Sequence, residues 1–202
     1  MFGKLFVFEG SDSAGKSTLS KGFADYLLSI GINCEHLAFP GNESGTLGHH
    51  ICEIHHNPTN LGIDSITSTS LQMLHIAAHV DAIERRILPT LKQGVSIVLD
   101  RFWWSTWVYG IVAGANLRSL RQMIRLELLH WKEIHPEIIF LITRETQRGS
   151  DVLESTNSQL NTAYLELAEK EMRRTSVCII ENNASLQEAL NSIQSAAKLK
   201  LQ

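Results

Sequence analysis

The sequence has few cysteines and no long apolar run, and each lack excludes a class of protein. Its three cysteines, Cys34, Cys52 and Cys178, are odd in number and far apart, which argues against a disulfide framework and for a reducing compartment. No stretch approaches the roughly 20 consecutive apolar residues that a membrane-spanning helix needs. We therefore expect a cytoplasmic protein with no membrane partner.

Neither sign of charge dominates the chain. Its 18 lysines and arginines stand against 21 aspartates and glutamates, and these residues are spread along the sequence. A nucleic-acid surface needs concentrated positive charge, so we expect no nucleic-acid partner. With 202 residues, 44% of them hydrophobic, the chain can bury a substantial core, and we expect a single domain over residues 1–202. The first apolar run begins almost at Met1, so we expect no signal or transit peptide.

The most informative stretch lies near the amino terminus. Residues 5–8 (LFVF) form a short apolar run that predicts a buried strand. Residues 10–17 (GSDSAGKS) then match the phosphate-binding pattern G-x-x-x-x-G-K-[ST] at every fixed position, and an amphipathic stretch with helical spacing follows. The backbone N–H groups of such a loop and the positive end of the helix attract phosphate oxygens. The residues expected to bind ATP are Gly10, Ser13, Ala14, Gly15, Lys16, Ser17 and Thr18.

Short apolar runs alternate with helical patterns along the rest of the chain. Four further strands are predicted over residues 33–39, 95–99, 138–143 and 177–180. This alternation predicts an α/β fold, with a five-stranded parallel sheet and helices on both faces. One long helix is expected over residues 68–93, with a kink near Pro89. Residues 144–161 are polar and lack periodicity, so we expect a mobile lid loop there.

Charged residues follow the predicted strands at the edge where a parallel sheet binds its ligand. Asp100 ends a strand, and its carboxylate can hold Mg²⁺ together with the hydroxyl of Ser17. Arg101 is expected to bind a phosphate of the second substrate, although a structural ion pair with Asp100 is an alternative. Arg144 and Arg148 lie in the predicted lid, where arginines can neutralise a transferring phosphoryl group or simply face solvent. The predicted catalytic residues are Lys16, Arg101, Arg144 and Arg148, and the predicted cofactor is Mg²⁺ with ATP.

Taken together, these motifs resemble the thymidylate kinase family over most of the chain. The resemblance rests on FEGxDxAGKST at residues 8–18, on Phe39-Pro40, on DRFxxSxxxY at residues 100–109, and on AYLELA at residues 163–168 after Arg148-Gly149. It implies a P-loop NTPase-type three-layer fold and a homodimer. The implied reaction moves the γ-phosphoryl group of ATP to a nucleoside monophosphate, with dTMP as the first choice.

The resemblance also implies roles at the acceptor site. Asp12 is expected to approach the 3′-hydroxyl of the acceptor, Arg101 its phosphate, and Tyr164 its deoxyribose. The full set of expected acceptor-binding residues is Asp12, Phe39, His75, His79, Arg101, Ser105, Tyr109 and Tyr164.

Several positions depart from the family pattern, mostly on the acceptor side. Gly41 replaces an arginine that grips the acceptor phosphate, and His75 and His79 replace a phenylalanine and an arginine that contact thymine. Gly110 stands where a glutamine usually follows Tyr109, and the lid is shorter than usual. Loss of two arginine contacts would weaken thymidylate binding by roughly 10²–10⁴ without compensation. The alternatives are a kinase for another nucleotide or nucleoside, and a nucleotide-binding regulatory protein without transfer activity.

Two side-chain clusters have competing interpretations. His49, Cys52 and His56 have the helical spacing of zinc ligands, but no second cluster completes a tetrahedron, so we interpret this segment as a histidine-rich surface helix. The tryptophans at positions 103, 104 and 107 are expected to fill the core beside the site.

Glu9, at the end of the first predicted strand, leaves two roles open. Its carboxylate would act on magnesium or the acceptor hydroxyl, or it would cap neighbouring backbone N–H groups.

Overall fold

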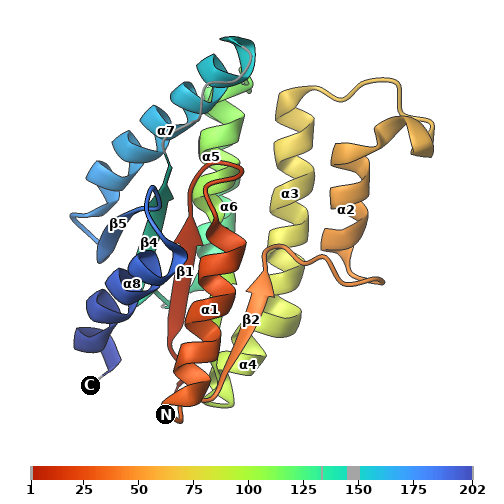
Figure 1. The fold of residues 1–202 in the computed structure, drawn as a ribbon. Helices are drawn as coiled ribbons and strands as arrows, with labels where there is room; N and C mark the ends of the chain where they lie inside the picture. Colours follow the sequence, from red (N-terminus) through yellow and green to blue (C-terminus); the bar gives the residue numbers. More distant parts are fainter. Residues whose placement is uncertain (1, 133, 145–150, 202) are drawn as a thin grey trace.

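The computed structural model describes residues 2–132, 134–144 and 151–201, and these residues form one parallel β-sheet with helices on both faces (Figure 1). The strands are β1 (Leu5–Glu9), β2 (Cys34–Ala38), β3 (Ser96–Asp100), β4 (Ile138–Thr143) and β5 (Val177–Glu181). Their order across the sheet is β2-β3-β1-β4-β5, and every pairing is parallel. The predicted three-layer α/β fold of the P-loop NTPase type is therefore confirmed.

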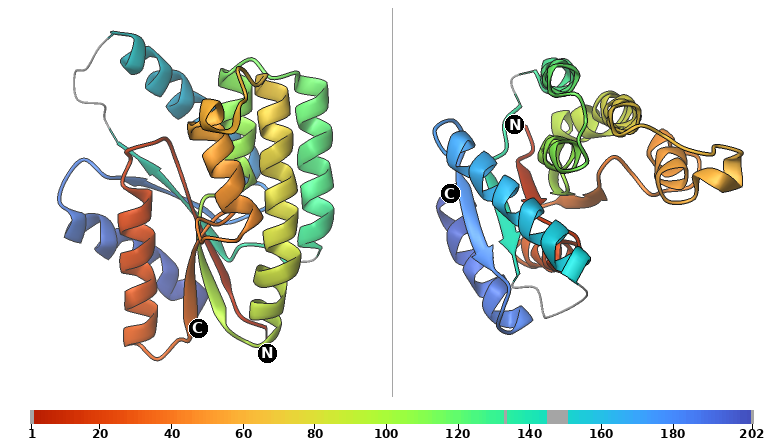
Figure 2. Two further views of the ribbon diagram at one scale, coloured as in Figure 1. Left: turned by 90° about the vertical axis from the view of Figure 1, so that its right-hand side faces the viewer. Right: turned by 90° about the horizontal axis from the view of Figure 1, so that it is seen from above.

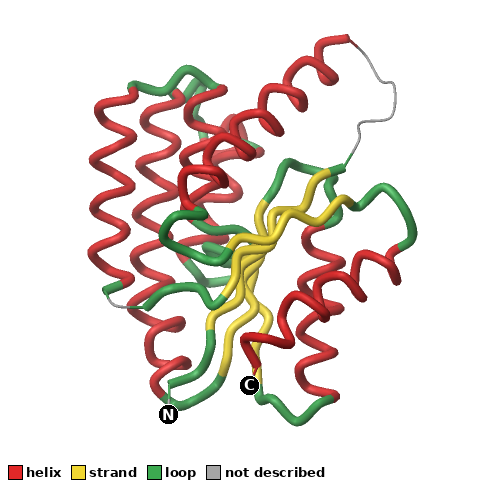
Figure 3. Tube along the Cα trace, turned by 90° about the vertical axis from the view of Figure 1, so that its left-hand side faces the viewer, coloured by secondary structure: helices red, strands yellow, loops and turns green. Residues whose placement is uncertain are grey.

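The alternating side chains of β1 divide the core into two layers. Leu5 and Val7 point to one face of the sheet, whereas Phe6 and Phe8 point to the other. Helices α1 (Lys16–Ser29) and α8 (Leu186–Leu201) cover the phenylalanine face, on the left of the first panel of Figure 2. The twisted sheet is seen between the two helical layers in Figure 3.

A larger set of helices covers the opposite face. It comprises α3 (Ser68–Ala82), α4 (Leu88–Lys92), α5 (Trp103–Val112), α6 (Leu117–Trp131) and α7 (Asp151–Glu171). Helix α2 (Leu47–His56) packs against α3 and is followed by the 3₁₀ turn η1 (Pro58–Leu61). Over the residues described, no helix combines the length and the apolar content needed to span a membrane. Trp103 and Trp104 are buried in this layer, as the core interpretation predicts.

The helix predicted over residues 68–93 is present but changes its geometry in the middle. After α3 the chain makes the π-helical segment η2 (Ile83–Ile87) and then continues as α4. Pro89 has no N–H to donate, and its ring would collide with the carbonyl group four residues earlier in a regular α-helix. A wider π turn removes that collision while keeping Ile83 and Ile87 in the core.

The prediction of a loop over residues 144–161 is wrong from Asp151 onward, because α7 begins there. The first turns of α7 are polar, and Leu160 is the first buried residue within residues 156–168. Tyr164, Leu167 and Ala168 continue that buried face and hold the helix against the sheet. The amino-terminal half therefore extends a helix that is anchored by its second half, and it carries no apolar periodicity of its own.

Candidate active site

The phosphate-binding loop joins β1 to α1 and leaves the start of that helix open. Gly15 precedes α1 in a left-handed conformation (φ 96°), and no side chain caps the first N–H groups of the helix. A Cβ atom at Gly10 would lie 2.2 Å from the carbonyl oxygen of Ile142, and one at Gly15 would lie 2.4 Å from the side-chain nitrogen of Asn182. Both positions thus require glycine, and the free N–H groups are suited to bind phosphate oxygens.

Two side chains complete this loop. Asn182, which follows β5 and has no signal in the sequence, donates from Nδ2 to the carbonyl oxygen of Ala14 at 2.8 Å. The Lys16 ammonium group donates to the carbonyl oxygen of Ser11 at 2.6 Å. Burial, reinforced by the positive charge of Arg101, lowers the pKa of Lys16 to about 8. A bound anion beside Lys16 would stabilise the charged form of its ammonium group and so raise this pKa again.

Ser17 and Asp100 come together as the sequence predicts for a magnesium site. The Ser17 hydroxyl donates to Oδ2 of Asp100. The other carboxylate oxygen, Oδ1, is buried and has no hydrogen-bond partner among the described residues. A buried carboxylate oxygen without a donor suits a hard cation, and Mg²⁺ commonly takes one or two protein ligands with phosphate and water completing its shell. The residues present fit this ion.

A cavity of about 300 Å³ opens beside the phosphate-binding loop. Its lining includes Asp12, Ser17, Asp100 and Arg101, with Ser105 and Tyr109 in contact with Arg101. Phe39, His75 and His79 also line it. All of these belong to the predicted site, so the fold brings the proposed donor and acceptor residues to one cavity. Further lining residues that sequence analysis missed include Asn42, Cys52, His55, Gln72 and Thr106.

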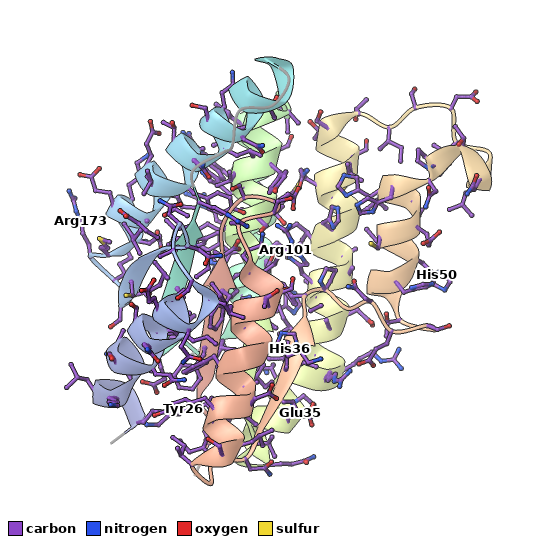
Figure 4. All side chains as sticks on the ribbon, viewed as in Figure 1. Tyr26, Glu35, His36, His50, Arg101 and Arg173 are labelled. Carbon is purple, nitrogen blue, oxygen red and sulfur yellow. The ribbon has the colours of Figure 1, made fainter. Side chains whose placement is uncertain are left out.

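Arg101 is the most constrained residue of this cavity. Its backbone is left-handed (φ 79°), a strained conformation for a residue with a side chain, and its N–H donates to the carbonyl oxygen of Phe8 at 2.9 Å. The guanidinium group pairs with the Asp12 carboxylate, donates to the Ser105 hydroxyl at 3.0 Å and lies over the Tyr109 ring. Figure 4 labels Arg101 beside the amino-terminal end of α1, on the side that faces α3.

The electrostatics of this pair keep both groups charged. Burial by itself would raise the pKa of the Asp12 carboxyl, but the charge of Arg101 and hydrogen bonding by Tyr109 outweigh burial and lower it. Asp12 is therefore a carboxylate that is already paired with the cation predicted to bind the acceptor phosphate.

Glu9 caps neighbouring donors, which favours the second of its two open roles. The carboxylate is fully buried and accepts from the backbone N–H groups of Phe102 (2.8 Å) and Ser105 (3.0 Å). It also accepts from the hydroxyls of Ser105 (2.8 Å) and Tyr164 (3.1 Å). Burial raises the pKa of Glu9, and the charge of Arg101 partly offsets this. These bonds fix the start of α5, and with it Arg101, against the end of β1.

The remaining predicted residues lie farther from the cavity. Tyr164 is buried in α7, with its hydroxyl 2.9 Å from that of Ser105, and it does not line the cavity. Its contact with a deoxyribose stays a prediction. Arg144 is exposed directly after β4, and Arg148 lies outside the described residues.

His79, which lines the cavity, belongs to a network of buried side chains. Its ring stacks on Phe39 with centroids 4.1 Å apart, and its Nδ1 lies 2.8 Å from Oε2 of Glu127. Glu127 is fully buried in α6 and also accepts from Nε1 of Trp131 at 3.1 Å. This contact occupies Nδ1 of His79 and leaves Nε2 for another partner.

His75 and the α2 histidines form a second group on the same wall. Nε2 of His75 lies 3.2 Å from Nδ1 of His55. Burial, aided by the charges of His79 and His55, lowers the pKa of His75 to about 3, so its imidazole is neutral near pH 7. Cys52, His55 and His56 line the cavity, so α2 is more than a surface helix. Over the described part of the chain, no group of three or more His, Cys, Asp or Glu side chains is placed to hold a metal ion.

Gly41 has a backbone conformation that few other residues adopt. Its φ of 125° lies in the region that favours glycine. An arginine at this position would strain the loop as it is folded here.

We expect Glu9→Gln to lower the free energy of unfolding by about 2–4 kcal/mol, because one or two buried donors lose their acceptor. Tyr164→Phe, which removes one of the donors, should cost about 1 kcal/mol. Urea denaturation measures both, with Glu53→Gln at an exposed position of α2 as the matched control. Equal stability of Glu9→Gln and the control would contradict the capping role.

Comparison with known proteins agrees with this geometry. A model of the thymidylate kinase family matches residues 8–193. A thymidylate kinase of Thermoanaerobacter sp. (strain X514) is 31% identical over 122 residues, which cover 60% of this chain and 57% of that protein's length. A thymidylate kinase of Chlamydia abortus is 27% identical over 206 residues, covering 95% of this chain and 94% of that protein. The crystal structure of thymidylate kinase from Ehrlichia chaffeensis shares the fold, with a TM-score of 0.78 at 20% identity over 98% of this chain and 100% of that one. Since the family model spans most of the sequence, this chain belongs to the thymidylate kinase family.

Proposed function

We propose that this protein is an ATP-dependent nucleoside monophosphate kinase, and that its acceptor is dTMP. The observation that carries the proposal is the shared cavity, which is lined both by the Ser17–Asp100 pair and by the Asp12–Arg101 pair. The names of the relatives support dTMP as the acceptor. A cytoplasmic location and a single domain belong to the same proposal.

In this proposal each residue has a positioning or electrostatic task. Lys16 and the loop amides hold the phosphates of ATP, and Ser17 with Asp100 would hold Mg²⁺, which neutralises charge on the transferring group when bound. Arg101 binds the acceptor phosphate, which is itself the nucleophile and needs no strong base. Arg144 and Arg148 are proposed to approach the transferring group from the lid. Positioning and charge neutralisation carry most of such a reaction.

We also propose that the protein is a homodimer, as its family resemblance implies. An apolar groove runs between α3 and α6, and its lining includes Met73, Val80, Met123 and Leu126. Met73 is 55% and Leu126 50% exposed in the isolated chain, which suits a surface that a second copy covers.

Sedimentation equilibrium tests the dimer. We expect the unaltered protein to be dimeric at micromolar concentration and Leu126→Glu to be monomeric, because the substitution buries a charge in the interface. Leu199→Glu, at an 81% exposed position of α8, should leave the dimer intact. A monomeric unaltered protein would exclude this interface.

A panel of nucleosides and nucleoside monophosphates, assayed with ATP and Mg²⁺, tests the reaction. We expect dTMP to be phosphorylated with the highest kcat/KM. Arg101→Gln should lower that value by about 10–100-fold, because a charged hydrogen bond to the acceptor phosphate is lost. Arg85→Gln, at a side chain that is 80% exposed, is the matched control.

The panel also separates the alternatives. Phosphorylation of another acceptor but not dTMP would replace the proposed substrate. Binding of ATP without transfer to any acceptor would favour a regulatory protein.

The lowered pKa of Lys16 predicts a pH dependence of ATP binding. The free protein loses the Lys16 charge above about pH 8, so the Kd for MgATP should rise about tenfold per pH unit from there. Lys16→Arg keeps its charge throughout this range, so its Kd should not rise between pH 8 and 10. A rise of equal size in this variant would assign the titration to another group.

A further inference from the structure

One face of α3 lines the cavity. Gln72, His75 and His79 are spaced so that they share this face, and all three line the cavity. The two imidazoles already have partners, since His79 pairs with Glu127 and His75 with His55. Gln72, in contrast to both histidines, has no such partner in the described part of the chain.

Gln72 is a buried residue whose side-chain amide faces the cavity and has no hydrogen-bond partner among the described residues. Only 4% of this residue is exposed, and it makes no hydrogen bond with any residue that the structure describes. Buried amides are almost always paired, because leaving their donors and acceptors unmet costs free energy. An amide that lines a cavity and has no partner within the protein is free to hydrogen-bond a molecule bound there.

Gly110 on α5 provides the space for this side chain. A Cβ atom at Gly110 would lie 3.2 Å from Cγ of Gln72 and 3.0 Å from both methyl groups of Leu120. Any larger residue at position 110 would therefore press on Gln72. Glycine inside a helix is otherwise unfavourable, so its presence here has a packing reason.

We propose that the Gln72 carboxamide hydrogen-bonds the base of the acceptor nucleotide and thereby determines which base is accepted. This inference rests on the proposed kinase function. An amide presents one donor and one acceptor side by side, which matches the N3–H and the adjacent carbonyl of thymine. The Thr106 hydroxyl is a second buried polar group of this cavity. Gln72 is thus a specificity-determining residue.

The test compares dTMP with its N3-methyl analogue, which lacks the N–H donor. Gln72→Met keeps the side-chain volume and removes both hydrogen bonds, so the Kd for dTMP should rise about 10–100-fold. The Kd for the analogue, which cannot form the pair, should change less than threefold, and the Kd for MgATP should not change. Gln187→Met, at an exposed position of α8, is the matched control. A purely structural role would weaken both nucleotides equally, and that result would overturn the inference, as would an unchanged Kd for dTMP.

Gly110→Ala provides a second, independent variant. By displacing the amide it should weaken dTMP binding, and it should have little further effect when Gln72 is already alanine. Equal effects in both backgrounds would show that Gly110 acts apart from Gln72, and would remove that part of the inference.

If the unaltered protein binds another monophosphate and not dTMP, the proposed substrate fails. The Kd of the same variants is then measured for that nucleotide and for an analogue whose base carries a methyl group on its hydrogen-bonding edge. This comparison decides the role of Gln72.

Discussion

The buried carboxylate of Glu9 is the interaction on which the geometry of the site depends. It ends the central strand β1 and accepts hydrogen bonds from the start of α5 and from α7. Gly10, the first residue of the phosphate-binding loop, follows it directly. One side chain therefore sets the distance between the loop and Arg101, whose left-handed backbone is kept in place by its neighbours. Its hydrogen bonds offset part of the cost of burying this carboxyl group.

The two halves of the site differ in how closely they follow the family. The phosphate-binding loop, Ser17, Asp100 and Arg101 match the family motif at each position and meet as that motif implies. The proposed base site is instead lined by two imidazoles and an amide from α3, with partners on α2 and α6. His75 and His79 are held by partners, so they form a fixed wall. This rebuilt wall is consistent with a kinase that recognises its acceptor by new contacts.

Much of the fold and half of the site could be predicted from the sequence, because their signals are local. The loop motif lies within eight consecutive residues, and Ile138–Thr143 is an uninterrupted apolar run. The capping box formed by Ser185 and Glu188 at the start of α8 is equally local. The first turns of α7 were missed because their helix is anchored by packing farther along the chain.

Contacts made between distant segments left no such signal. Glu127 and His79 are 48 residues apart, and His55 and His75 are 20 apart, so neither pairing follows from spacing. A crystal structure of the protein with dTMP and ADP tests most directly whether the α3 wall is the acceptor's base site. We expect the phosphate on Arg101, the sugar near Asp12 and the thymine edge on Gln72, between His75 and Thr106. A thymine that lies away from the α3 wall, or a phosphate that does not touch Arg101, would contradict this account.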